Sequence, residues 1–333
     1  MGFFDGLRRD KKQAEPVQQE QRVEADTVED EIAIEHIEVV ERAPHETPSV
    51  EEEPIEERPV IESTPIRSYR DKKPVTHVVG QTKSMTIINQ KGVAGKSTTA
   101  INLSAALGEL GKQVLLVDLD PQGNSSSGLG IEKSQVNNCI YDVLLNDVPI
   151  EEVIIPDVCE GLDLVPATIN LAGAEVELVA EMARENRLKD AVGSLRGKYD
   201  YVFIDCPPSL GLLTVNALVA ADKLLIPIQC EFYALEGVTK LLDSMKRVKT
   251  RLNPTLDIYG VLMTMYDGRT TLSRQVVEEV RAYFGRLVFE TQIPRTVKLS
   301  EAPSFGQPIT LYDPSGKGAQ SYMSLAKEVI ARG

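Results

Sequence analysis

The segment 85–99, with the sequence MTIINQKGVAGKSTT, constrains the fold of this chain more than any other. Its first residues are apolar and β-branched, which predicts a buried strand, and helical spacing of apolar residues begins at Ser97. A loop between strand and helix presents free backbone N–H groups and the positive end of the helix dipole. Lys96 adds a positive charge there, and Ser97 adds a hydroxyl suited to Mg²⁺. The segment predicts a phosphate-binding loop, with an ordinary strand–helix turn as the alternative.

This loop departs from the regular pattern G-x-x-x-x-G-K-[ST], because Gln90 occupies its first glycine position. The remaining residues, Lys91-Gly92-Val93-Ala94-Gly95-Lys96-Ser97, resemble the deviant loop K-G-G-x-G-K-[ST] of the ParA/MinD group of ATPases. In that group a second lysine, here Lys91, reaches the nucleotide of the partner subunit. Val93 stands where the group has its second glycine. We therefore expect ATP binding with a slow turnover.

An acidic segment precedes the loop. Residues 13–64 contain 17 acids and 3 bases, which accounts for the whole formal net charge of −14. The segment contains five prolines and almost no aromatic residues, so it cannot bury enough apolar surface to fold. We expect residues 1–80 to form a disordered acidic tail and residues 81–333 to form one ATPase domain.

The first twelve residues place an apolar cluster before four bases. Such a pattern can contact an anionic membrane, but so short a segment anchors weakly, and we favour a solvated end over a membrane contact through residues 1–12. The sequence has no signal-peptide pattern and no run of about 20 apolar residues, which favours a cytoplasmic location. The four cysteines form no C-x-x-C pair, and all three histidines precede residue 80, so neither a zinc site nor a histidine base is expected in the domain.

Strand and helix patterns alternate through the rest of the chain. Strands are expected at 86–88, 113–118, 162–166, 199–205, 223–227, 258–265 and 287–293. Helices are expected at 97–110, 172–182, 184–195, 233–252, 318–331, and from a cap at Ser273 to Phe284. Because parallel strands need crossover connections, this order predicts an α/β fold: a doubly wound, mainly parallel sheet flanked by helices, of the P-loop NTPase type.

Acidic residues follow two of the expected strands. Asp118 and Asp120 come at the end of one, and Asp205 closes an apolar run in another. Ligands of open α/β sheets bind at the carboxyl ends of the strands. We favour one carboxylate of the first pair as the group that orients water and Mg²⁺, and Asp205 as a Walker B carboxylate. A capped turn and an ordinary buried strand end are the alternatives.

Several motifs in order make the resemblance more specific. The loop is followed by DLDPQGN, FIDCPPSLG, PIQCEFYALEG and IPRTVKLSEAPS, and residues 85–332 resemble the ParA/Soj-type chromosome or plasmid partition ATPases. The resemblance implies that Ser97 and Asp205 serve Mg²⁺, that Asp120 positions the attacking water, and that Lys91 acts in trans. The residues that it implies around ATP are Gly92, Val93, Ala94, Gly95, Lys96, Ser97, Thr98, Met265 and Pro294.

The same resemblance implies how the protein works. The family forms an ATP-bound sandwich dimer, binds DNA nonspecifically at the nucleoid, and is reset when a ParB-type partner stimulates hydrolysis. In this sequence the candidate DNA contacts are bases near the late loops, namely Arg269, Arg295 and Lys298, with Arg274 nearby. Nonspecific DNA binding depends on phosphate contacts, so a dimer that doubles this set of bases binds better than a monomer.

Three other functions remain open. A MinD-like septum-placement ATPase shares the loop but carries a C-terminal amphipathic membrane helix, whereas this sequence continues only to Gly333 after its last expected helix. A nitrogenase-type iron protein needs cysteines that bridge a cluster, and Cys206 has no convincing partner. A nucleotide-responsive scaffold with little turnover is kept open by Val93.

Overall fold

The structure is a computed structural model, and it describes residues 80–92, 94–232 and 234–333. The acidic tail expected at residues 1–80, except Gly80 itself, therefore lies outside the described residues. The same holds for the substitution at Val93.

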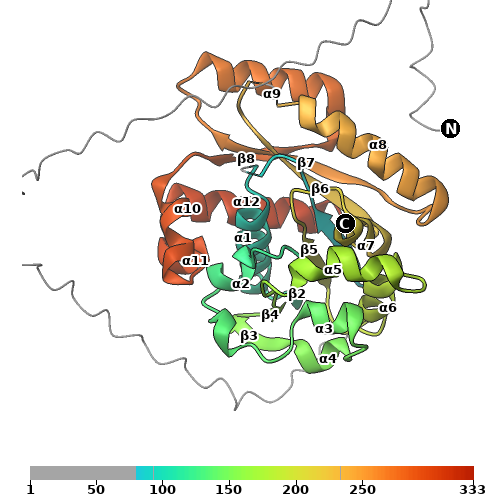
Figure 1. The fold of residues 1–333 in the computed structure, drawn as a ribbon. Helices are drawn as coiled ribbons and strands as arrows, with labels where there is room; N and C mark the ends of the chain where they lie inside the picture. The colour runs from blue at the N-terminus through green and yellow to red at the C-terminus, as the bar shows by residue number, and fades with distance from the viewer. Residues whose placement is uncertain (1–79, 93, 233) are drawn as a thin grey trace, which may run out of the picture. The chain divides into compact units, whose positions relative to one another are not determined.

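An eight-stranded sheet lies at the centre of the described domain, in the order β3-β4-β2-β5-β1-β6-β7-β8 (Figure 1). The strands are β1 Lys83–Ile87, β2 Val114–Asp118, β3 Ile155–Cys159, β4 Leu162–Val165, β5 Tyr201–Asp205, β6 Lys223–Gln229, β7 Asp257–Tyr266 and β8 Val288–Pro294. Neighbouring strands are parallel except β3 and β4. The predicted α/β fold with a mainly parallel sheet is confirmed.

The antiparallel edge strand β3 is absent from the sequence-based prediction. Its five residues include Pro156, and Asp157 has a φ of 52°, so the segment lacks the apolar run of a buried strand. It pairs only with β4, and the register shifts between Ile155 and Cys159. Pairing at the edge of the sheet, rather than local propensity, makes this segment a strand.

Helices connect the strands and flank the sheet. They are α1 Lys96–Glu109, α2 Asn124–Gly128, α3 Ile140–Leu145, α4 Ile150–Val153, α5 Leu171–Glu177, α6 Arg187–Gly193, α7 Leu212–Ala220, α8 Glu236–Arg251, α9 Thr271–Phe284, α10 Val297–Glu301, α11 Ile309–Tyr312 and α12 Lys317–Ala331. The helix expected at 172–182 is shorter than predicted, because a 3₁₀ turn follows α5. The cap assigned to Ser273 was wrong: Thr270 caps α9, and its Oγ1 accepts a hydrogen bond from Ser273 N at 3.2 Å.

Two apolar clusters cover the two faces of the sheet. Leu115 and Val117 of β2 pack in the cluster that includes residues of α3 to α9, and Val114 and Leu116 pack in the cluster of α1, α11 and α12. This alternation follows from the pleat of the strand, and it explains why β2 is apolar throughout. Among the described residues, none of the helices is both long and apolar enough to span a membrane.

Candidate functional site

The candidate site lies at the carboxyl ends of three adjacent strands, β2, β5 and β1. In the parallel register, Asp205 of β5 is paired with Ile87 of β1 on one side and with Asp118 of β2 on the other. The loop before α1 and the acids after β2 therefore meet at Asp205. This is the edge of an open α/β sheet at which ligands bind.

The loop between β1 and α1 is held on two sides. Gly95 immediately precedes α1 with a φ of 81°, a conformation that favours glycine. Thr264 Oγ1 of β7 donates to Ala94 O at 2.9 Å. Asn89 Nδ2 donates to Pro227 O at 2.7 Å, and its Oδ1 accepts from Lys91 N at 3.0 Å. The described part of the loop is thus fixed by β6 and β7.

Lys96 occupies the centre of this loop. Its side chain is buried, with 4% of the residue exposed, and Nζ donates to the carbonyls of Lys91 and Gly92 at 3.3 and 3.5 Å. Burial lowers the pKa of Lys96, and the nearby Asp205 and Asp120 partly oppose that shift. Carbonyl oxygens compensate a buried ammonium only weakly, so an anion at this loop would be stabilised.

Asp205 presents one unused carboxylate oxygen. Ser125 Oγ donates to Oδ2 at 2.7 Å, whereas the buried Oδ1 meets no hydrogen-bond partner among the residues that the structure describes. Burial raises the pKa of Asp205 to about 6, although the hydroxyls of Ser125 and Ser97 and the charge of Lys96 lower it. A buried carboxylate oxygen without a partner, close to a serine hydroxyl, matches the oxygen ligands that Mg²⁺ prefers.

No group of three or more His, Cys, Asp or Glu side chains in the described part of the chain could hold a metal ion. A cation beside Asp205 would therefore need further oxygen ligands from water or from a bound phosphate, which is how Mg²⁺ is usually held at nucleotides. The residues present fit Mg²⁺ that arrives with a nucleotide.

The two acids after β2 differ in their contacts. Asp118 Oδ2 accepts from Ser126 N at 2.8 Å and from Ser126 Oγ at 2.7 Å, and Oδ1 accepts from Asp120 N at 3.3 Å. Burial, and secondly the charge of Asp205, raises the pKa of Asp118 to about 7. Among the described residues, the carboxylate of Asp120 accepts one hydrogen bond, from the backbone N of Gln122 at 3.0 Å. Asp118 therefore stabilises the turn, and Asp120 is the carboxylate available to a reactant.

Sequence reasoning missed the serines that support these acids. Ser125 and Ser126 belong to α2, and each contacts a different aspartate of the site. The available signal was the run of three serines directly after D-P-Q-G-N, because clustered hydroxyls near buried carboxylates satisfy their oxygens.

A pocket of about 360 Å³ adjoins the loop. Its lining includes Gly95 and Thr98 from the loop side, Met265 after Thr264, and Pro294 and Arg295 at the end of β8. The structure therefore places Met265 and Pro294 next to the phosphate-binding loop. The pocket has apolar and polar walls, as a nucleotide base requires.

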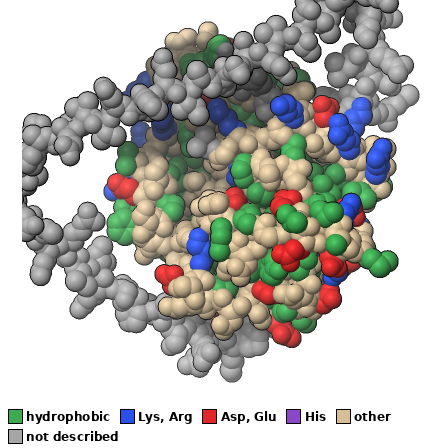
Figure 2. Space-filling model, in the orientation of Figure 1, with side chains coloured by type: hydrophobic (Ala, Val, Ile, Leu, Met, Phe, Trp, Pro, Cys, Tyr) green, Lys and Arg blue, Asp and Glu red, His purple; other side chains and the backbone are tan. Residues whose placement is uncertain are grey.

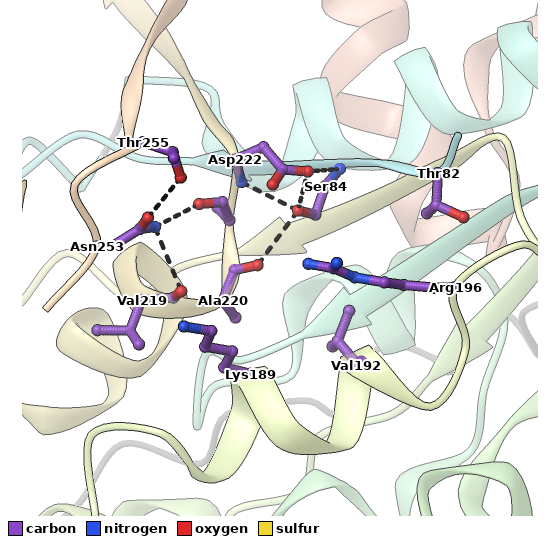
Figure 3. A pocket seen from close by; sticks show the side chains of 12 residues that line it. Thr82, Ser84, Lys189, Val192, Arg196, Val219, Ala220, Asp222, Asn253 and Thr255 are labelled. Carbon is purple, nitrogen blue, oxygen red and sulfur yellow. Dashed lines mark hydrogen bonds between the residues drawn. The ribbon is translucent and has the colours of Figure 1, made fainter. Parts of the chain in front are cut away.

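A second, smaller cavity of about 130 Å³ lies at the opposite end of β1 (Figure 3). Figure 3 shows Ser84 bonded to Asp222, whose Oδ2 accepts from Ser84 N at 3.1 Å and from Ser84 Oγ at 2.7 Å. Ala220 O also accepts from Ser84 Oγ, at 3.2 Å. A carboxylate and main-chain carbonyls disfavour a phosphate, although Lys189 and Arg196 are among the residues that line the cavity.

Two of the predicted DNA contacts are paired within the chain. Arg269 binds Asp267 through Nε at 2.9 Å and Nη2 at 2.8 Å, and Arg269 lowers the pKa of Asp267 to about 2. Lys298 Nζ lies 2.8 Å from Glu301 Oε2. Arg295 lines the 360 Å³ pocket and is exposed. These residues follow β7 and β8, so the structure places them at the same sheet edge as the loop.

Other bases lie on α8, which carries Lys240, Lys246, Arg247, Lys249 and Arg251. Figure 2 shows Lys and Arg side chains gathered on the α8 side of the visible face, whereas acidic and apolar side chains lie over α5 and its neighbours. The sequence analysis did not assign α8 to DNA. Its helical spacing alone does not distinguish a DNA contact from an ordinary solvated face.

The cysteines disfavour an iron–sulfur site. All four are free, and burial raises the pKa of Cys159, Cys206 and Cys230 to about 12. Within residues 80–92, 94–232 and 234–333, the cysteines do not gather with other ligands into a group of three or more that could hold a metal ion. Cys206 is fully buried behind Asp205.

Comparison with known proteins gives consistent results. The AAA domain family model (AAA_31) matches residues 82–258. The chain is 57% identical over 251 residues to the sporulation initiation inhibitor protein Soj of Bacillus subtilis, which covers 75% of this chain and 99% of Soj. It is 56% identical over 246 residues to the chromosome partitioning protein ParA of Myxococcus xanthus, covering 74% of this chain and 87% of ParA.

Solved structures share the fold. A structure of cobyrinic acid a,c-diamide synthase from Mycobacterium smegmatis with bound ADP and magnesium is 40% identical, with a TM-score of 0.66 over 75% of this chain and 94% of that chain. The septum site-determining protein MinD of Pyrococcus horikoshii, complexed with Mg-ADP, is 30% identical, with a TM-score of 0.61 over 74% of this chain and 96% of that chain.

Proposed function

The chain belongs to the ParA/Soj family of chromosome-partitioning ATPases, and from this premise we propose that it hydrolyses ATP in an ATP-bound dimer that binds DNA nonspecifically. A ParB-type partner resets the dimer by stimulating hydrolysis. The proposal rests on one observation: Lys96 lies close to both Asp120 and Asp205 at the carboxyl edge of the sheet. The identity of 57% to Soj, against 30% to MinD, favours partition over septum placement.

ATP binding follows from charge. Among the described residues, the hydrogen-bond partners of the buried Lys96 ammonium are the carbonyls of Lys91 and Gly92, so the phosphates of ATP would offer it a stronger, anionic partner. The hydroxyl of Ser97 and the free Oδ1 of Asp205 would hold Mg²⁺. Mg²⁺ neutralises phosphate oxygens when it is bound. The base fits the pocket beside Met265 and Pro294.

Hydrolysis follows from position. Phosphoryl transfer depends mainly on placing the nucleophile and stabilising charge. Asp120 stands on the turn held by Asp118. Within the part of the chain that the structure describes, its carboxylate accepts a single backbone N–H, so it can orient the attacking water. Lys91, at the start of the same loop, would supply a positive charge to the nucleotide of the partner subunit.

DNA binding follows from the bases after β7 and β8. These basic residues, Arg269, Arg295 and Lys298, contact DNA phosphates and do not distinguish one base sequence from another. A dimer presents two copies of these three residues to the DNA. The acidic tail at residues 1–80 competes with DNA phosphates for these basic residues at low salt, and a spacer or a partner-docking arm is the alternative.

The test is an ATPase assay with purified protein, alone, with DNA, and with DNA plus the cognate ParB-type protein. We expect slow basal turnover that rises when both are present, and loss of ATP binding in Lys96→Ala by calorimetry. ATP affinity unchanged by Lys96→Ala, or turnover unaffected by DNA and partner, would contradict the proposal.

A further inference from the structure

The side chain of Lys91 is already engaged within its own chain. Its Nζ lies 3.4 Å from Glu231 Oε2. The two residues come from different parts of the sheet edge, since Lys91 follows β1 and Glu231 follows β6. Their side chains are 39% and 43% exposed, so the pair can open without disturbing the core.

The carboxylate of Glu231 is itself held in place. Gln229 Nε2 donates to Glu231 Oε1 at 2.5 Å, and the backbone N of Glu231 donates to Gln229 O at 2.8 Å. Gln229 is buried, so its amide is a fixed donor rather than a mobile surface group. The two oxygens of Glu231 are therefore divided between Gln229 and Lys91.

The same amide reaches the wall of the nucleotide pocket. Gln229 Nε2 lies 3.1 Å from Met265 Sδ, and Met265 lines the pocket beside Gly95 and Thr98. Met265 also has a φ of 52°, an unusual conformation for a residue that is not glycine. A continuous set of contacts thus runs from the pocket wall through Gln229 and Glu231 to Lys91.

Lys91 cannot remain on Glu231 and also reach a nucleotide in a second protomer. We infer that Glu231 is a positioning residue that binds Lys91 in the single protomer and opposes ATP dimer formation until Lys91 is released. This inference rests on the proposed ATP dimer, and it adds a contact within the protomer that regulates formation of that dimer. Gln229 sets the position of the Glu231 carboxylate. A nucleotide base bound in the pocket would contact Met265, whose Sδ lies beside the Gln229 amide.

The expected size of the effect on dimer formation follows from the partial exposure of the Lys91–Glu231 ion pair. A half-exposed ion pair changes an equilibrium by about two- to fivefold. Two protomers release one pair each, so loss of both pairs tightens the dimer about 4- to 25-fold. Because the charges are partly exposed, the difference shrinks at high salt.

Glu231→Gln tests the inference, because it removes the charge and keeps the shape. Dimer formation is measured by analytical ultracentrifugation of the full chain with Mg²⁺ and a non-hydrolysable ATP analogue. We expect a dimer dissociation constant about 4- to 25-fold below wild type at low salt, with the difference reduced at high salt. Glu151→Gln is the matched control: it neutralises another ion pair, with Lys198 at 3.1 Å, and should leave the constant unchanged.

Two further variants separate the possible failures. Lys91→Ala should lose the dimer, and Glu231→Gln added to Lys91→Ala should change nothing more. An unchanged or weaker dimer in Glu231→Gln, with a wild-type melting curve, overturns the inference while leaving the proposed function intact. A dimer of wild-type affinity in Lys91→Ala would instead contradict the proposed role of Lys91 in trans, and absence of any dimer in the wild-type protein would contradict the proposed function itself.

Discussion

Asp118 and Asp205 are paired in register on the adjacent parallel strands β2 and β5, and both side chains are fully buried. At this position the negative charge of Asp205 raises the pKa of Asp118. The pKa of Asp118 is raised to about 7 and that of Asp205 to about 6, in both cases chiefly by burial.

These shifts predict how stability depends on pH in the nucleotide-free protein. A raised pKa means that the folded state binds protons more tightly than the unfolded chain, so stability falls as pH rises. The contribution is complete below about pH 4 and is lost as pH passes through about 6 to 7. Scanning calorimetry with a chelator present should show a lower Tm at about pH 8 than at about pH 5. Asp118→Asn should flatten this slope; an equal slope in both proteins would contradict the assignment.

Asp120→Ala should slow hydrolysis and spare ATP binding. A carboxylate that orients water acts in the transition state, so we expect kcat to fall on the order of 100-fold with little change in Kd. Gln122→Ala is the control, because Asp120 Oδ1 accepts from the backbone N of Gln122 and that bond survives the substitution. Single-turnover kinetics and calorimetry measure the two quantities, and wild-type kcat in Asp120→Ala would refute the role.

Neutralising Asp267 should strengthen DNA binding. Its carboxylate binds Arg269 at 2.8 and 2.9 Å and competes with DNA phosphates for that guanidinium. We expect Asp267→Asn to bind DNA more tightly in the ATP state, and Arg269→Ala to bind more weakly with a shallower salt dependence. Glu290→Gln, which frees Arg281 instead, is the control. Equal affinities of wild type and Asp267→Asn in a fluorescence titration would argue against Arg269 as a DNA contact.

Gly108 should not tolerate a side chain. A Cβ at this position of α1 would lie 2.0 Å from the backbone oxygen of Glu160, so Gly108→Ala must separate α1 from the β3–β4 turn. We expect a loss of about 1–3 kcal/mol in the free energy of unfolding. Gly193, in α6, has nothing within 4 Å of its Cβ position, and Gly193→Ala should stabilise by about 0.5–1 kcal/mol. Urea denaturation compares the two, and equal effects would contradict the packing argument.

Val93→Gly should raise ATP turnover. Val93 stands where the resembling family has its second glycine, and a stiff β-branched side chain in a loop that wraps phosphates is expected to hold turnover down. Steady-state ATPase rates of wild type and Val93→Gly measure the effect. An unchanged rate would show that Val93 does not limit turnover.

The sequence by itself determined the elements whose signals are local. The apolar run of β2, the loop before α1 and the aspartate at the end of β5 were all predictable, because period and residue type reveal buried strands and helix starts. Alternation of strands and helices then led to the parallel sheet. The edge strand β3 could not be predicted, since pairing with β4 makes it a strand.

Only the tertiary structure decided which polar groups meet. Glu231 lies 140 residues from Lys91, and nothing in either local sequence indicates their contact. The different roles of Asp118 and Asp120 likewise depend on α2, whose Ser126 binds Asp118 and leaves Asp120 open. The physical reason is that hydrogen bonds and ion pairs between distant residues depend on strand order and register, which bring the ends of β1, β2, β5 and β6 together at one edge.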